Sequence, residues 1–300
     1  MTSDWAARER ARIAGRDSTD QHTRQFSIGE YGIRLLTELM EGSIEVNNTL
    51  VDELSDRMVQ SGSPLKDSWN DFLLLIFSAA MSTSSDRSHH HLVDLVFALA
   101  HRHERPATVD ATDNMTGTSE VASLFSSLTG FGWIARDYWN GPGTFLHAYG
   151  TPDAAQRASV NLNRFMAHLS CQQRKTPVEP LREWVEDFGL WTITDGLEEP
   201  AGIREHAEEA TAWLIIAGID IYNDPTWGRR DGKRRTGIPL RQGRLWSARQ
   251  AEGSTQEMRW DFWKDRLLEI AGDLSKDESV RNVAREAEQV MREIETSAQV

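Results

Sequence analysis

The sequence predicts an all-α fold: a single multi-helix domain around a central buried helix, with no significant sheet. Two observations favour it. Apolar residues recur with the helical period in nearly every segment, and no segment shows convincing strand alternation. Residues 203–223 are predicted to be the central helix, because their middle, 210–219, is apolar on every side except at Thr211 and Gly218. A helix without a polar face belongs inside a protein.

The helices expected before the central one follow the spacing of apolar residues. Residues 4–16 form a charged helix that we expect at the periphery, so that residues 1–24 stand apart from an all-helical domain at 25–300. A loop rich in Thr, Asp and Asn is expected at 107–119. The other expected helices of this part are 28–60, as one helix or as two broken near Gly42, then 69–80, 86–103, 120–128, 153–169 and one that starts at Pro180.

Two capping boxes mark the helices that follow the central one. Pro225 ends the central helix, and a basic loop with several glycines follows at 227–246. Residues 254–257 and 275–278 each place Ser three positions before Glu, and such a pair satisfies the free N–H groups at the start of a helix. In total we expect roughly nine to twelve helices.

The composition is that of a soluble globular protein with many tryptophans. There are 11 Trp and 10 Phe but only 4 Tyr, and large apolar rings build cores or line apolar ligand pockets. The formal charge of −13 argues against affinity for nucleic acid or anionic membranes. A single cysteine, Cys171, permits no internal disulfide, and no run approaches the roughly 18 apolar residues of a membrane span. Since a signal segment is also lacking, we expect a cytoplasmic protein.

Two aspartates at the end of the central helix are the first candidates for a functional site. Asp220 and Asp224 lie one turn apart at the negative end of the helix dipole, where carboxylates are disfavoured and repel each other. One interpretation is a structural pair that binds Arg229 or Arg230, or that reaches solvent. The other is a Mg²⁺ site, since this cation takes carboxylate and phosphate oxygens. Asp187 is then the possible third ligand, or else a partner of a tryptophan or an arginine.

Positive charge gathers in the loop after these aspartates. Between residues 229 and 249 there are eight Lys or Arg against one acid, Asp231. The loop is either solvated or holds an anion, and nucleic acid is disfavoured by the acidic remainder of the chain. Arg229 and Arg230 beside the aspartates would make a magnesium–diphosphate site. Lys264 is either a surface residue whose stem covers apolar atoms or a further contact to that anion.

Aromatic residues on the helices are candidates for the wall of a substrate pocket. Their ring faces can stabilise a carbocation, and the alternative is that they only fill the core. The five candidates are Trp184, Trp191, Trp213, Trp260 and Trp263.

Three consecutive histidines at 89–91 suggest a metal tract. Successive residues of a helix point in different directions, so we expect a solvated helix start there instead. Nucleophile motifs, P-loops, dinucleotide fingerprints and zinc-ligand spacings are absent from the sequence.

Three motifs, in this order, resemble those of a large family of filamentous-fungal, all-helical proteins catalogued as a domain of unknown function (DUF3632). They are Ala-Trp-Leu-Ile at 212–215 with Ala-Gly at 217–218 and Ile-Tyr at 221–222, Gly-Arg-Leu-Trp at 243–246, and Trp-Asp-Phe-Trp-Lys at 260–264. The similarity covers residues 92–268. Membership implies a fungal, often gene-cluster-associated protein without an assigned reaction.

A looser likeness is to the humulene-type sesquiterpene cyclases of fungi. Those enzymes are all-helical and hold farnesyl diphosphate with a magnesium cluster and a helix-borne lysine. The likeness matches Lys264 to that lysine and Asp220 and Asp224 to the cluster. The chain departs from the pattern in lacking a DDxxD motif, and Pro225 interrupts an NSE-like start at Asn223.

The sequence therefore favours an enzyme of fungal secondary metabolism that acts on an apolar small molecule, most concretely a Mg²⁺-dependent cyclase of farnesyl or another prenyl diphosphate. In that mechanism Mg²⁺, Arg229, Arg230 and Lys264 would stabilise the departing diphosphate. One alternative is a non-catalytic helical interaction or scaffold protein. Another is a metal-free isomerase or cyclase that uses the same aromatic pocket. An enclosed aromatic cavity would favour either enzyme, and a solid core would favour the interaction protein.

Overall fold

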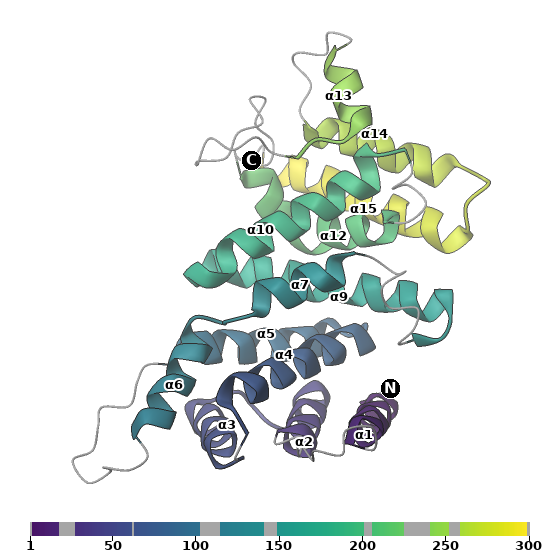
Figure 1. Ribbon diagram of the computed structural model, residues 1–300. Helices are drawn as coiled ribbons and strands as arrows, with labels where there is room; N and C mark the ends of the chain where they lie inside the picture. The colour runs from purple at the N-terminus through teal and green to yellow at the C-terminus, as the bar shows by residue number, and fades with distance from the viewer. Residues whose placement is uncertain are drawn as a thin grey trace. The chain divides into compact units, whose positions relative to one another are not determined.

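The computed structural model of the chain describes residues 2–17, 28–61, 63–102, 115–140, 149–200, 206–224, 241–251 and 259–298. Within these residues it contains 13 α-helices and one π-helical segment, and no strand (Figure 1). The predicted all-α fold is confirmed. The helices form two compact units, the first with residues 1–138 and 176–182 and the second with residues 139–175 and 183–300.

The first unit is built around α2 and α4. Helix α2 packs against α1, α4 and α5. The side chains of Trp69, Phe72 and Phe77 on α4 are completely buried, which gives this unit its own apolar core. Its helices are α1 Thr2–Asp17, α2 Gly29–Glu41, α3 Asn48–Gln60, α4 Leu65–Ser82, α5 Asp86–Ala100, α6 Met115–Ser126 and α7 Phe131–Trp139.

Helix α1 is an integral part of the first unit, whereas we expected residues 1–24 to stand apart from the remaining helices. The side chain of Trp5 is completely buried, and its Nε1–H donates to the Oγ of Ser78 on α4 at 3.0 Å. Ser78 in turn donates to the Glu9 carboxylate at 2.7 Å. One aromatic side chain therefore anchors a helix whose overall composition is charged.

Two helices, α2 and α3, occupy the stretch that the sequence predicted as one helix or two. Gly42 follows α2 with a φ of +70°, in the left-handed region that favours glycine. The N–H groups of Gly42 and Ser43 donate to carbonyls in the last turn of α2. Asn47 then caps α3, because its side chain accepts the N–H of Leu50 at 3.0 Å.

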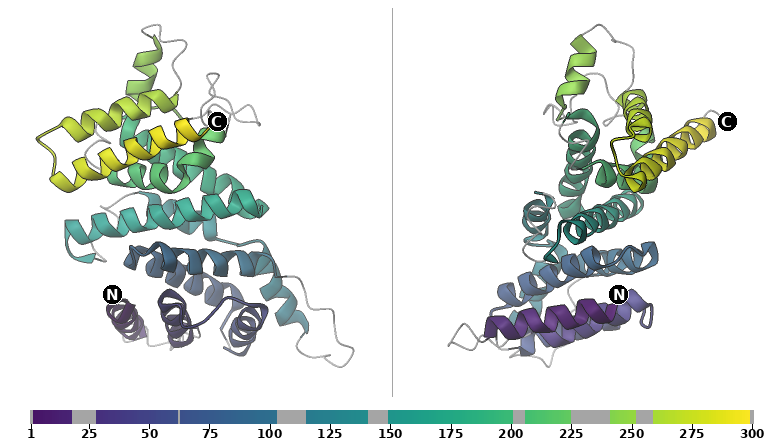
Figure 2. Two further views of the ribbon diagram at one scale, coloured as in Figure 1. Left: turned by 180° about the vertical axis from the view of Figure 1, so that it is seen from behind. Right: turned by 90° about the vertical axis from the view of Figure 1, so that its right-hand side faces the viewer.

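The second unit is organised around α12, which packs against both α9 and α15, while α15 also packs against α14 (Figure 2). The elements from α9 onward are α9 Pro152–Lys175, α10 Glu179–Ile193, the π-helical η1 Thr194–Glu198, α12 Ala207–Asn223, α13 Arg244–Ala251, α14 Arg259–Gly272 and α15 Glu278–Ala298.

Helix α12 is the central helix that the sequence predicted. Residues 203–205 lie outside the described residues, so the observed helix begins at Ala207. Ten of its 17 residues are buried, among them Trp213 and Leu214 with no exposed surface. Ile219, however, is 43% exposed. The side of the helix that carries Ile219 is therefore exposed, whereas the sequence predicted burial on every side.

Candidate functional site

Three carboxylates of the second unit, those of Asp195, Glu198 and Glu199, lie in or directly after η1, the π-helical segment that continues α10. Segments of π-helix are rare and occur frequently at functional sites. At Gly196 a Cβ atom would lie 2.6 Å from both the Cβ of Ala210 and the carbonyl oxygen of His206. The close approach of η1 to the start of α12 therefore requires glycine at this position.

At the end of η1, Glu198 forms a buried ion pair with Arg259 of α14. Glu198 has no exposed surface, and Arg259 is 2% exposed. The guanidinium donates to both carboxylate oxygens, at 2.8 Å from Nη2 to Oε2, and to Thr194 Oγ1 at 3.1 Å. The carboxylate also accepts the Gly243 N–H and the Trp263 Nε1–H, both at 2.8 Å. Such bonds to the remaining polar atoms are what a buried ion pair needs. We refer to these five residues as the Glu198 cluster.

Two further ion pairs lie at η1. Asp195 pairs with Arg241, and Glu199 pairs with Arg244 at 2.7 Å. Burial raises the pKa of Asp195, although the charge of Arg241 opposes the rise. Partial burial also disfavours ionised Glu199, but hydrogen bonds from Arg244 outweigh that effect and lower the pKa of this carboxyl. Two arginines of the predicted basic loop thus bind carboxylates of the protein itself.

The structure places the three aspartates predicted as metal ligands at separate positions. Asp224 binds Arg174 of α9 at 2.7 Å. Asp220 lies close enough to Cys171 for its charge to raise the pKa of that thiol, which donates to the carbonyl oxygen of Ile216 at 3.5 Å, and Asp187 lies on α10. In the part of the chain that the structure describes, these three carboxylates do not form a group whose oxygens lie within 4.8 Å of one another. The cation beside Asp224 is therefore an arginine from another helix.

The thiol of Cys171 is expected to react slowly in the folded protein. Burial raises its pKa to about 12, and the charge of Asp220 adds to the rise. Because the thiolate is the reactive form, alkylation at pH 8 should be about a thousandfold slower than for an unfolded thiol with its ordinary pKa. Mass spectrometry after iodoacetamide treatment, with and without denaturant, measures the two rates.

Two substitutions separate the causes of this slow reaction. Asp220→Asn should accelerate alkylation of the native protein, because it removes the negative charge that disfavours the thiolate. Asp56→Asn, at an exposed position of the first unit, should leave the rate unchanged. Equal alkylation rates in the native and denatured protein would contradict a buried, protonated Cys171.

Of the three residues predicted to hold a diphosphate, the structure describes only Lys264. Arg229 and Arg230 lie outside the described residues. Lys264 of α14 binds Glu295 of α15 and lies 3.2 Å from the Asp261 carboxylate. Partial burial disfavours the charged lysine, but hydrogen bonds with these two carboxylates outweigh that effect and raise its pKa. Lys264 is therefore a charged residue with two carboxylate partners.

Three of the five tryptophans predicted to bind substrate are packed in the interior. Trp213 has no exposed surface, and its Nε1–H donates to the Oδ1 of Asn163 at 2.9 Å. Trp260 and Trp263 are 5% and 1% exposed, and each also donates its indole N–H to a carboxylate. These three rings act as core side chains with satisfied polar atoms.

The other two predicted tryptophans, Trp184 and Trp191, are partly exposed on α10. The ring of Trp191 meets the ring of Trp139 edge to face, with centroids 5.3 Å apart. The guanidinium of Arg241 lies 5.4 Å from the centroid of Trp139. Trp191 therefore contacts a ring that lies beside Arg241, the ion-pair partner of Asp195.

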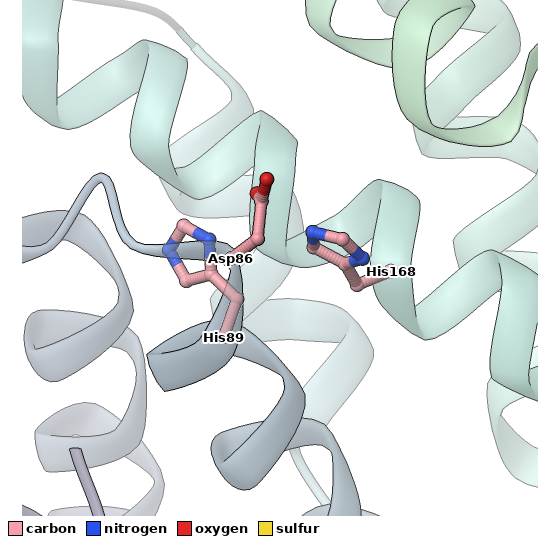
Figure 3. Close-up of side chains that lie close together, drawn as sticks. All are labelled: Asp86, His89 and His168. Carbon is pink, nitrogen blue, oxygen red and sulfur yellow. The ribbon is translucent and has the colours of Figure 1, made fainter. Parts of the chain in front are cut away.

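The histidine tract at 89–91 differs from its prediction at one position. Figure 3 shows Asp86 and His89 at the start of α5 in the first unit and His168 on α9 of the second. His89 has no exposed surface, and its Nε2 lies 3.0 Å from the carbonyl oxygen of Ala80. The expectation of a solvated helix start is therefore wrong for His89, because this turn of α5 packs against the end of α4.

The Glu198 cluster was not predicted as a site, yet two of the sequence motifs lead to it. Gly243 belongs to the Gly-Arg-Leu-Trp motif and Trp263 to the Trp-Asp-Phe-Trp-Lys motif, and both donate N–H groups to Glu198. A Cβ at Gly243 would lie 2.4 Å from the Cβ of Glu198. Arg259 directly precedes the Trp-Asp-Phe-Trp-Lys motif. These motifs were the sequence signal that could have indicated the cluster. Glu198 itself, a single glutamate in a π-helical segment, belongs to no local pattern that would mark it as a site residue.

The comparison with known proteins identifies a family and no individual relative. A family model described as "Protein of unknown function (DUF3632)" matches residues 74–267, which include the Glu198 cluster and both motifs that contact it. No curated protein and no solved structure matches the chain. Of the helices that the structure describes, none is long and apolar enough to cross a membrane.

Proposed function

We propose that this chain, which belongs to the DUF3632 family of proteins of unknown function, acts as a non-catalytic helical interaction protein. The observation that carries the proposal is that side chains expected to perform catalysis are bonded within the helical packing. Lys264 binds Glu295, and Asp224 binds Arg174. Side chains engaged in this way stabilise a scaffold and are not free to hold a diphosphate.

The acid pair at the end of α12 already has a cationic side chain beside it, so it does not need a metal ion. Two carboxylates at the negative end of a helix dipole need positive charge nearby, and the guanidinium of Arg174 lies 2.7 Å from Asp224. A Mg²⁺ ion would have to displace this bond and would need further oxygen ligands around it. The geometry supports the structural interpretation of the pair, with Arg174 in the role that we expected for Arg229 or Arg230.

The packing of the aromatic residues supports the same proposal. A substrate wall requires rings that face an open cavity, whereas Trp213, Trp260 and Trp263 are at most 5% exposed and have bonded N–H groups. The metal-free isomerase or cyclase would use the same rings, so the argument applies to it as well. Buried rings of this kind contribute to stability through their packing.

Incubation with geranyl, farnesyl and geranylgeranyl diphosphates in the presence of Mg²⁺, followed by product analysis, tests the proposal. We expect no cyclised product and no pyrophosphate release above the rate without protein, because Lys264 and Asp224 are engaged elsewhere. A product that is lost in Lys264→Ala but kept in Lys66→Ala, an exposed control lysine, would overturn the proposal in favour of a prenyl diphosphate cyclase.

We also propose that the protein works in the cytoplasm of a fungal cell. Its lone cysteine, with a thiol kept protonated by burial, suits a reducing compartment. The motif resemblance implies a filamentous-fungal source and association with gene clusters. Partners of the interaction protein would then be proteins of secondary metabolism.

A further inference from the structure

A groove of about 360 Å³ lies on the first unit between α2 and α3. Its ten lining residues include three apolar and three acidic side chains, and of the apolar ones only Leu35 is buried. We call its apolar lining residues, Leu35, Ile44 and Leu50, the floor, and its acidic lining residues, Glu38, Glu45 and Glu53, the rim. We refer to this site as the acidic groove.

The backbone around the acidic groove is held in place by its own bonds. Gly42 ends α2 in a left-handed conformation, and a Cβ there would lie 3.0 Å from the Nη2 of Arg87. Nδ1 of His91 lies 2.7 Å from the carbonyl oxygen of Leu39 in the last turn of α2. Asn47 caps the first turn of α3. A groove that is already formed loses little conformational freedom when a ligand binds.

Two of the rim carboxylates have unused binding capacity. Within the described residues, the side chains of Glu38 and Glu45 make no ion pair and no hydrogen bond. Glu53 is engaged with Tyr31, whose pKa is raised to about 12 by burial and by the charge and hydrogen bond of Glu53. The basic residue of the lining, Arg34, lies 5.5 Å from the Tyr31 ring centroid. The lining is therefore net negative, and among the described residues Glu38 and Glu45 have no cationic partner.

We propose that the acidic groove binds a basic amphipathic segment of a partner protein. Apolar side chains of that segment would rest on Ile44 and Leu50, and its Lys or Arg side chains would bind Glu38 and Glu45. The proposal gives the interaction protein a binding site and the chemistry of its partner, and it rests on that proposed function.

Charge and shape favour this ligand over others. Three carboxylates and one guanidinium line the groove, so acidic segments and free anions are repelled. Five of the ten lining residues are exposed, whereas a small-molecule site encloses most of its ligand. An amphipathic helix laid into a groove is a recurring mode of peptide recognition.

Fluorescence anisotropy with the full chain and a labelled peptide tests the proposal. The probe is an amphipathic peptide of Leu, Lys and Ala, and its counterpart carries Glu in place of every Lys. We expect saturable binding of the Lys peptide that weakens as salt is raised, and no binding of the Glu peptide. Glu38→Gln/Glu45→Gln should weaken binding about 3- to 10-fold. Ile44→Ser should weaken it by about the same factor, because it removes apolar floor.

A matched control separates the groove from the general acidity of the chain. Asp56→Asn/Glu286→Gln removes the same charge from exposed positions outside the groove, and it should change the affinity by less than about twofold. Equal weakening by this control would overturn the proposal. A peptide complex that is insensitive to Ile44→Ser and fully displaced by spermine would overturn it too, and would assign the groove to a polyamine.

The two proposals fail in different ways. If no peptide binds and the prenyl diphosphates are not turned over, the groove proposal is overturned and the interaction protein stands. If a cyclised product forms, the interaction protein is overturned, and the groove proposal falls with it.

Discussion

Replacing Arg259 by methionine is expected to destabilise the protein by about 3–5 kcal/mol, because it leaves a buried carboxylate without its charge partner. Glu198 has no exposed surface, and the N–H groups of Gly243 and Trp263 would be its remaining donors. These neutral donors do not replace a guanidinium that binds both oxygens. Equilibrium unfolding in urea, followed by circular dichroism, measures the loss.

Arg244→Met is the matched control for this substitution. The Arg244 side chain also binds a carboxylate, that of Glu199, but it is 74% exposed, so its loss should cost at most about 1 kcal/mol. The double variant Glu198→Gln/Arg259→Met should recover part of the stability, because it removes the uncompensated charge and keeps an acceptor for Gly243. An Arg259→Met protein as stable as Arg244→Met would contradict a structural role for the Glu198 cluster.

Trp213→Ala is expected to cost about 3–5 kcal/mol, as for other large-to-small changes of buried aromatic residues. The ring has no exposed surface, and its N–H donates to Asn163, which would keep only the Thr192 hydroxyl as a donor to the same oxygen. The measurement is again urea unfolding. This substitution bears on function, because the sequence predicted Trp213 as a substrate-binding residue.

Two further variants help to interpret the stability of Trp213→Ala. Trp133→Ala removes the same side chain where it is 63% exposed, and should cost less than about 1 kcal/mol. Trp213→Phe keeps most of the ring and loses the hydrogen bond, so it should fall between Trp213→Ala and the unaltered protein. Native stability of Trp213→Ala would mean that the ring lines an accessible cavity, and would revive the enzyme hypothesis.

Local patterns sufficed for much of the fold. The helical period and the apolar middle at 210–219 predicted an all-α protein with α12 at the centre of its neighbours, and both were observed. The break near Gly42 was left open, since a glycine permits a left-handed turn without demanding one. The burial of Trp5 escaped prediction because the apolar side of α1 is too narrow to stand out from its charges.

The partners of charged and aromatic groups depended on the tertiary structure. The sequence by itself determined that Asp224, at the negative end of a buried helix, needs a nearby cation. Packing of α9 on α12 decided that the cation is Arg174, 50 residues away in the chain. The donors of Glu198 likewise come from positions 243, 259 and 263. Local periodicity sets which segments are helical and which face is apolar, but only the packing of helices distant in sequence brings a charge to its partner.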